Sequence, residues 1–388
     1  MTRVSPFVGL MFDRSVVGSY DRVTTPPYDV ISDAERRRFL EASPFNVIRL
    51  ELGSDGGPEE PESQYRRAGE CLRAWRDDGA LVPTEGPAYF PYEMRFSLHG
   101  RARTIRALIC AVELEAWGGS IVAHERTMEG PIEDRLRLTR EVRANLSSIH
   151  ALIRGPNDPL ASFLDAVSAD EPAAVAADEA GVEHRIWVAP PEPEVATWLE
   201  PESLMIADGH HRYSMALRYR DEMRERLGPG PWDHVMMLVA DAAVQEPPVL
   251  PFHRIQAAGR FEARGARVRD LAEVLETVDD DRLVYGTAAL EDGVLVHRVA
   301  ELEGGPPAVV ALHDQVLAGV VDHLRYTADA AAAEEAVHTG EAIGAYFLPP
   351  TDATRIRAVI DRGGPLPPKS TFFWPKPRSG LLIRPLDP

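Results

Sequence analysis

The amino-acid sequence predicts a mixed α/β protein, and three observations support this fold class. Segments with the apolar pattern of strands alternate with segments of helical period along most of the chain. Such alternation is typical of helices layered on sheets. The 388 residues exceed what one hydrophobic core usually holds, so more than one domain is expected. Apolar residues make up 44% and charged residues 27%, as in ordinary globular proteins.

Residues 1–120 are expected to form an N-terminal α/β domain whose role is unclear. Residues 25–30 contain two consecutive prolines, which favour a rigid extended segment. Ser32 and Asp33 are suitable caps for the helix that follows. The predicted elements of this domain are a helix over 35–41, a strand over 46–52, a helix over 65–77, and strands over 88–98 and 103–114.

The rest of the chain continues the alternation, and we expect a second domain over 121–265 and a C-terminal α/β domain over 266–388. The apolar stripe from Leu138 to Ile149 predicts one long helix. The predicted elements are helices over 133–149, 214–223 and 313–324, a further helix ending at 360, and strands over 186–188, 204–207, 235–240 and 344–348.

The composition disfavours a nucleic-acid partner and a membrane. The net charge is −19, and no block of Lys or Arg forms the basic face that binding to a polyanion needs. Lys369 and Lys376 are the only lysines, and they lie close together in the sequence. No apolar run is long enough to span a bilayer and the N-terminus lacks a signal peptide, so we expect a cytoplasmic protein. Cys71 and Cys110 are expected in the core, because two cysteines make neither a disulfide framework nor a four-thiolate zinc site.

The most reactive segment is the run Asp208-Gly209-His210-His211-Arg212, which follows an apolar strand pattern and opens a helical one. The first amides of a helix lack intrahelical partners and carry partial positive charge, so this geometry suits an anion such as phosphate. The alternative is a solvated turn that is rich in histidine, and short motifs of this kind are often accidental.

Three further segments are rich in reactive groups. Residues 124–127 place a Glu after a strand pattern, where it is either a general base or a surface carboxylate. Residues 368–376 combine both lysines with two hydroxyls and an aromatic run, and for Phe372 and Trp374 we favour a place in the core. Asp29 is either a metal or hydroxyl partner or an ordinary turn residue.

Several nucleotide and metal motifs are absent from the sequence. It contains no P-loop, no glycine-rich dinucleotide fingerprint after a strand, and no His-Glu-x-x-His. The side chains of His210 and His211 are adjacent in sequence and therefore diverge, which disfavours a metal site made from this pair. A Mg²⁺ ion bridged to nucleotide phosphates fits better, with Asp208 as its nearest carboxylate.

The Asp208–Arg212 run resembles the nucleotide-binding motif of the free serine kinases, which belong to the ParB/sulfiredoxin-like superfamily. Further matches occur in the same order along the chain: His124-Glu125, Gly340 to Phe347 with Pro350-Thr351, and Pro368-Lys369-Ser370-Thr371. The whole chain also resembles a large bacterial and archaeal family of unknown function, through its Pro-Pro-Tyr-Asp-Val, Ala-Asp-Gly-His-His-Arg-Tyr and Pro-Lys-Ser-Thr segments.

This resemblance implies a ParB/sulfiredoxin-like nucleotide-binding core over 121–265 and transfer of phosphate from ATP or ADP to a hydroxyl, with free L-serine as the first acceptor. It makes Glu125 the catalytic base. Asp208 then acts through Mg²⁺ or orients the hydroxyl, and His210 acts in catalysis. The residues expected to hold the nucleotide phosphates are Gly209, His210, His211 and Arg212, and those expected at the acceptor are His124, Lys369, Ser370 and Thr371.

The chain departs from the kinases at two positions. They carry Trp where this chain has Tyr213, and a basic residue where it has Phe372, so the acceptor and the donor stay open. A second hypothesis is a ParB-like switch that binds and hydrolyses nucleotide without a small acceptor. A third is a scaffold in which the His-rich turn is structural. The N-terminal third either covers the active site or forms a homodimer face.

Overall fold

The computed structural model describes residues 1–53, 63–98, 100–153, 155–241, 247–305, 307–362 and 366–387. These residues form helices and strands throughout, so the predicted mixed α/β class is confirmed. They divide into two compact units. The first unit comprises Met1–Ala123, Thr127–Pro247 and Pro375–Pro388, and the second comprises His124–Arg126 and Pro248–Trp374. The three-domain division stays a prediction.

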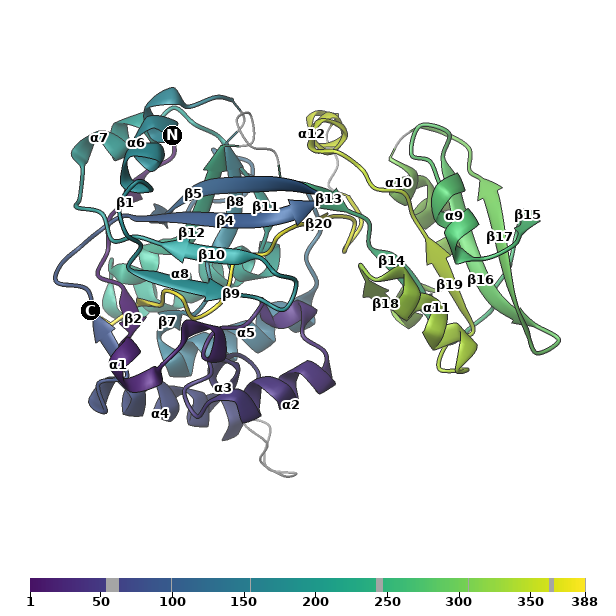
Figure 1. The fold of residues 1–388 in the computed structure, drawn as a ribbon. Helices are drawn as coiled ribbons and strands as arrows, with labels where there is room; N and C mark the ends of the chain where they lie inside the picture. Colours follow the sequence, from purple (N-terminus) through teal and green to yellow (C-terminus); the bar gives the residue numbers. More distant parts are fainter. Residues whose placement is uncertain are drawn as a thin grey trace. The chain divides into compact units, whose positions relative to one another are not determined.

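The described part of the first unit is built on a nine-stranded mixed sheet (Figure 1), in the order β6-β11-β8-β12-β5-β4-β10-β9, with β1 paired to β5. Two small antiparallel pairs, β2 with β3 and β7 with β21, complete its strands. The strand bounds are β1 Val4–Ser5, β2 Leu10–Phe12, β3 Leu81–Pro83, β4 Phe90–Leu98, β5 Arg101–Glu113, β6 Ile121–Ala123, β7 Ala144–Asn145, β8 Ile149–Ile153, β9 Ala174–Ala177, β10 Glu183–Ile186, β11 Leu204–Asp208, β12 His234–Asp241 and β21 Arg384–Pro385.

Helices cover this sheet because each buries an apolar stripe. Residues of α6, α7 and α8 join the strands in one core cluster, and the opposite side of α8 packs against α5. Helix α2 begins at a capping box formed by Ser32 and Glu35. The helix bounds are α1 Arg14–Val17, α2 Asp33–Ala42, α3 Ile48–Glu51, α4 Ser63–Asp77, α5 Glu129–Val142, α6 Asp158–Val167, α7 Pro193–Leu199 and α8 His210–Leu227.

The second unit contains a six-stranded sheet in the order β15-β17-β16-β19-β14-β18 among its described residues, and a separate pair of β13 with β20. Helices α9 and α11 pack on this sheet through small apolar side chains such as Ala333 and Val274. The element bounds are β13 Val249–Leu250, β14 His253–Gln256, β15 Ala266–Val268, α9 Leu271–Thr277, β16 Val284–Glu291, β17 Val294–Glu301, α10 Ala308–Leu312, β18 Leu324–Thr327, α11 Ala330–His338, β19 Gly344–Phe347, α12 Ala353–Asp361 and β20 Phe372–Phe373.

The strand predicted over 46–52 is wrong, because residues Ile48–Glu51 form the short helix α3. The side chain of Asn46 accepts a hydrogen bond from the Ile48 amide at 2.9 Å and donates one to the Arg22 carbonyl at 2.8 Å. An Asn side chain that bonds to the backbone two residues ahead bends the chain into a turn. The local bond therefore overrides the β propensity of the apolar residues.

The helix predicted over 133–149 is too long at its C-terminal end. Helix α5 ends at Val142, and Arg143 adopts a left-handed conformation with φ 47°. Asn145 then lies in β7, where its side chain accepts the Met236 amide at 3.0 Å, and Ile149 begins β8. The helical spacing of apolar residues continues past Val142 by chance, but those residues belong to β7 and β8, which pair with segments distant in the sequence.

The helix predicted over 313–324 is also wrong in part. Residues His313–Leu317 form a π-helical turn at the end of α10, and Leu324 already begins strand β18. Nη2 of the buried Arg254 lies 3.2 Å from the His313 ring, so a tertiary contact accompanies the irregular turn.

Within the described residues, none of the helices combines the length and the apolar character that crossing a bilayer requires.

Candidate functional site

The Asp208 turn has the predicted geometry of a strand, a glycine and a helix. Strand β11 is buried along its length and ends at Asp208, and helix α8 starts at His210 and runs for 18 residues. Gly209 stands between them with φ 100°, a left-handed conformation that glycine adopts without strain. The helix start has no side-chain cap, so its first amides have the character of an anion site.

Replacing Gly209 by alanine is expected to lower the free energy of unfolding by about 1–3 kcal/mol, because an L-residue is strained at this φ. The added Cβ would also lie 3.0 Å from the guanidinium of Arg212. Gly130→Ala is the matched control, since that glycine lies in α5 with open space around it, and should change stability by less than about 1 kcal/mol. Urea unfolding measures both, and equal stabilities would contradict the prediction.

Two cations hold the carboxylate of Asp208. Arg212 donates to Oδ2 and Lys376 donates to Oδ1. The three side chains are 8–10% exposed, so solvent screens the charges little. Arg212 also donates from Nη1 to the Ser147 hydroxyl at 3.0 Å and to the Ser148 carbonyl at 2.6 Å. Two buried cations therefore face the Asp208 carboxylate at the start of α8.

The side chains of His210 and His211 diverge, as their adjacency predicts. The ring of His210 is stacked on Trp117 with centroids 6.4 Å apart and planes at 17°. Nε2 of His211 accepts the Met128 amide at 2.9 Å, which fixes the start of α5. Each histidine therefore contacts a different segment of the first unit.

The residues around Asp208 do not fit a Mg²⁺ ion held directly by this carboxylate. Both carboxylate oxygens accept hydrogen bonds from cations, whereas Mg²⁺ needs oxygen ligands that face it. Among the described residues, no group of three or more His, Cys, Asp or Glu side chains is arranged to hold a metal ion. We therefore assign no step of a reaction to a metal at Asp208.

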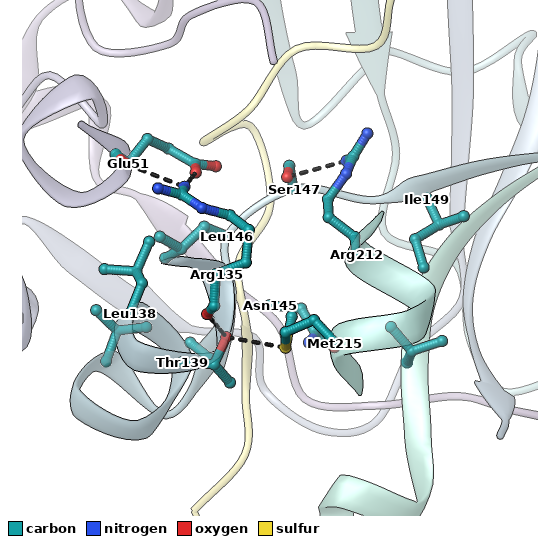
Figure 2. Close-up of a pocket in the computed structure, with 13 residues that line it drawn as sticks. Glu51, Arg135, Leu138, Thr139, Asn145, Leu146, Ser147, Ile149, Arg212 and Met215 are labelled. Atoms are coloured by element: carbon teal, nitrogen blue, oxygen red, sulfur yellow. Dashed lines mark hydrogen bonds and ion pairs between the residues drawn. The ribbon is translucent and has the colours of Figure 1, made fainter. Parts of the chain in front are cut away.

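A pocket of the first unit lies beside Arg212 (Figure 2). At its edge, Arg135 donates from Nη1 to both the carbonyl and Oε2 of Glu51 at 3.0 Å. Tyr28, in the Pro-Pro-Tyr segment, covers the guanidinium of Arg135 at 4.1 Å. Burial raises the pKa of Glu51, and the charges of Arg135 and Arg212 offset part of that rise. The N-terminal third thus contributes Glu51, the carboxylate of a buried ion pair, and the Tyr28 ring that covers its partner Arg135.

Glu125 accepts two backbone hydrogen bonds in the second unit. Lys369 donates to Oε1 at 2.6 Å and Ser370 donates to Oε2 at 3.3 Å. Lys369 adopts φ 55°, a conformation that is uncommon for a residue with a side chain. Glu125 is buried, with 9% exposure, so the surface-carboxylate interpretation of this residue is wrong.

The other residues predicted at the acceptor belong to the same part of the second unit. Nε2 of His124 lies 2.6 Å from the Thr371 hydroxyl, and the His124 ring meets Phe373 edge to face. The Ser370 hydroxyl donates to the Pro367 carbonyl at 2.6 Å. The loop that carries both predicted hydroxyls is therefore tied to the segment of Glu125.

The buried Arg254 is a member of this group that sequence reasoning missed. Its Nη2 donates to the Lys369 carbonyl at 3.1 Å, and burial lowers its pKa to about 10. The backbone of Lys369 is thus held at two points: its amide donates to Glu125, and its carbonyl accepts from Arg254. The sequence contains no signal for Arg254, because it occurs inside an ordinary strand pattern.

The predicted site residues fall into two groups, which belong to different units. Residues 208–212 lie in the first unit, and His124, Glu125, Lys369, Ser370 and Thr371 lie in the second. Sequence reasoning singled out Lys369 of the two lysines, whereas Lys376 is the one that pairs with Asp208. The scarcity of lysine was the signal that pointed to both.

The two departures from the kinases have different environments. Tyr213 is fully buried, and its hydroxyl donates to the Glu115 carbonyl at 2.8 Å, so it is a core residue of α8. Phe372 is half-buried in β20 and meets Phe252 edge to face at 5.2 Å. The core placement expected for Phe372 and Trp374 is met only in part, because both are half-buried, whereas Phe373 between them is 0% exposed.

Comparisons with known proteins identify a family and several similar structures. No curated protein matches the sequence. A free serine kinase in complex with AMP shares 12% identity with a TM-score of 0.38, over 65% of this chain and 83% of the kinase. A conserved hypothetical protein from Pyrococcus furiosus shares 12% identity with a TM-score of 0.35, over 66% and 90% of the two chains. A family model described as a protein of unknown function, DUF1015, matches residues 4–298. The chain therefore belongs to the DUF1015 family of proteins of unknown function.

Proposed function

We propose that this protein is a phosphotransferase that moves a phosphoryl group from ATP or ADP to the hydroxyl of a small molecule, with free L-serine as the first candidate. One observation carries the proposal: the start of α8 combines uncapped helix amides with Arg212 and Lys376 around a single carboxylate. Buried cationic side chains beside a helix N-terminus suit a phosphate chain. The ordered sequence segments shared with the free serine kinases support the same activity.

We also propose that residues 121–265 provide a ParB/sulfiredoxin-like nucleotide-binding core. In this proposal the amides after Gly209, together with His210, His211 and Arg212, bind the phosphates of the nucleotide. Phosphoryl transfer depends mainly on positioning and on neutralising charge, and these residue types supply both.

Glu125 is proposed as the general base. The acceptor O–H loses its proton to the Glu125 carboxylate, an oxygen–phosphorus bond forms, and the bond between the transferred phosphorus and the nucleotide breaks. The nucleotide leaves with the electron pair of that bond. Glu125 already accepts two amide hydrogen bonds, but a carboxylate has about four acceptor sites and retains capacity for a proton.

The loop after Pro368 is proposed to bind the acceptor. Lys369 supplies a charge that suits the carboxylate of an amino acid, while Ser370 and Thr371 supply short-range hydroxyl donors. The bond between His124 and Thr371 gives that hydroxyl a defined position. Asp208 is proposed to orient groups at the nucleotide through Arg212 and Lys376.

The experiment that tests this function is an acceptor screen. Purified protein is incubated with Mg²⁺, ATP or ADP labelled in the terminal phosphate, and a panel of hydroxyl compounds that includes L-serine. Phosphorus NMR and mass spectrometry then detect a phosphate ester. We expect O-phospho-L-serine or another phosphorylated small molecule, formed in proportion to the nucleotide consumed.

Two results would contradict the proposal in different ways. Tight nucleotide binding with slow hydrolysis and no product from any acceptor would favour the ParB-like switch. The absence of nucleotide binding, combined with an Arg212→Ala variant that loses only stability, would favour the scaffold.

A further inference from the structure

His150 is a buried histidine whose ring has no hydrogen-bond partner among the residues that the structure describes. It lies in β8 and is 0% exposed, and among the described residues neither ring nitrogen has a hydrogen-bond partner. A buried polar group without a partner costs free energy of folding, so nearly all such groups in native proteins are paired. An exception of this kind requires an explanation, and a ligand that supplies the missing partners is one.

Another histidine of the same sheet shows the ordinary arrangement. His184 in β10 is also 0% exposed, but its Nδ1 lies 3.0 Å from the Tyr92 hydroxyl and its Nε2 lies 3.3 Å from Asp178. Burial alone therefore does not deprive a histidine of partners in this sheet. The difference lies in what surrounds His150.

The strand register brings Asp208 opposite His150. Strands β11 and β8 are antiparallel, and Ile206 pairs with Ala151 on the face that enters the apolar core. The register then shifts, so that Asp208 rather than Ala207 pairs with His150. A shift of this kind re-aims a side chain across the sheet, and it puts the carboxylate and the imidazole on one face.

The charges of Asp208, Arg212 and Lys376 all affect the pKa of His150. Burial lowers the pKa of His150 to about 4, the charge of Asp208 opposes this change, and the charges of Lys376 and Arg212 add to it. At neutral pH the ring is therefore uncharged, with one N–H donor and one bare nitrogen. An uncharged N–H donor beside the two cations Arg212 and Lys376 is suited to the oxygen of an anion.

We propose that His150 is a phosphate-contacting residue of the Asp208 turn, where its ring N–H donates to an oxygen of a bound phosphate group. This inference rests on the proposed nucleotide site and adds a residue to it. Binding requires the Lys376 side chain to move from Asp208 onto the phosphate, which its flexible four-carbon stem allows. The imidazole then gains the partner that it lacks in this structure.

The test compares His150→Leu with His184→Leu. Leucine at position 150 removes two unpaired polar atoms from the core, so this variant should unfold at the same temperature as the wild type or higher. Its affinity for ADP and for pyrophosphate, measured by calorimetry, should fall about tenfold or more, which is the effect of one hydrogen bond to a charged group. His184→Leu breaks two hydrogen bonds, so it should melt at a lower temperature and keep its affinities.

Further results distinguish a failure of the His150 contact from a failure of the proposed kinase function. His150→Gln retains a side-chain N–H and should recover most of the lost affinity. Unchanged affinity in His150→Leu, or in His150→Phe if the leucine variant does not fold, overturns the proposal. If pyrophosphate binds and requires His150 but no acceptor is phosphorylated, the kinase function fails while the phosphate contact stands. If neither ADP nor pyrophosphate binds the wild type, both fail.

Discussion

Asp208→Asn is expected to lower the free energy of unfolding by about 3 kcal/mol or more, because it leaves two cations without their counter-charge. Arg212 and Lys376 are 9% and 8% exposed in their side chains, so water does not replace the carboxylate. The amide is nearly isosteric, and the change therefore reports the charge rather than the packing. Urea unfolding without nucleotide measures this effect.

The control for this prediction is an exposed ion pair of the same unit. Glu129 pairs with Arg218, and their side chains are 71% and 42% exposed, so Glu129→Gln should change stability by less than about 1 kcal/mol. Combining Asp208→Asn with Lys376→Met removes one of the unpaired cations and should restore part of the stability. If Asp208→Asn unfolds like the wild type, the carboxylate is not the counter-charge of this cluster.

Glu125→Gln is expected to slow phosphoryl transfer by about 10²–10⁴-fold, the usual contribution of a general base. An amide cannot take the proton of the acceptor hydroxyl, whereas it retains the size of the side chain. The affinity for ADP should stay within about twofold of the wild type, since the proposed phosphate contacts are on other residues. Single-turnover kinetics and calorimetry measure the two quantities separately.

Glu125→Gln also changes two hydrogen bonds, and this effect has to be distinguished from the loss of the base. The Gln side chain accepts one amide where Glu125 accepts those of Lys369 and Ser370, so a loss of about 1–3 kcal/mol in stability is expected. Glu276→Gln, on the exposed side of α9, is the neutral control. Transfer at the wild-type rate by a folded Glu125→Gln variant would exclude this residue as the base.

The sequence was sufficient to predict those helices and turns whose conformation depends on residues a few positions away in the chain. The capping box at Ser32 and the apolar face from Tyr65 to Trp75 correctly indicated helices α2 and α4. The turn at Gly209 was predictable for the same reason, because a strand pattern, a glycine and a helix pattern follow one another directly. Caps, glycine conformations and helical periods act over a few residues.

Prediction failed where a distant partner decides the conformation. The helix predicted to Ile149 instead ends at Val142, because Asn145 bonds to Met236 and Ile149 pairs in the sheet with Met237. Strand β5, which belongs to the first 120 residues, also pairs with β12 in the nine-stranded sheet. No period in the sequence carries information about such pairings, which join segments that are distant in the sequence.

The sequence by itself determined that the chain is mixed α/β, that residues 208–212 form a turn between a strand and a helix, and that Glu125 and Lys369 are candidates for chemistry. Only the tertiary structure decided that Lys376 holds Asp208, across 168 positions of sequence, and that His150 lies opposite the same carboxylate. The physical reason is that a turn follows from local backbone preferences, whereas the charge and hydrogen-bond partners around it depend on which strands pair and in which register.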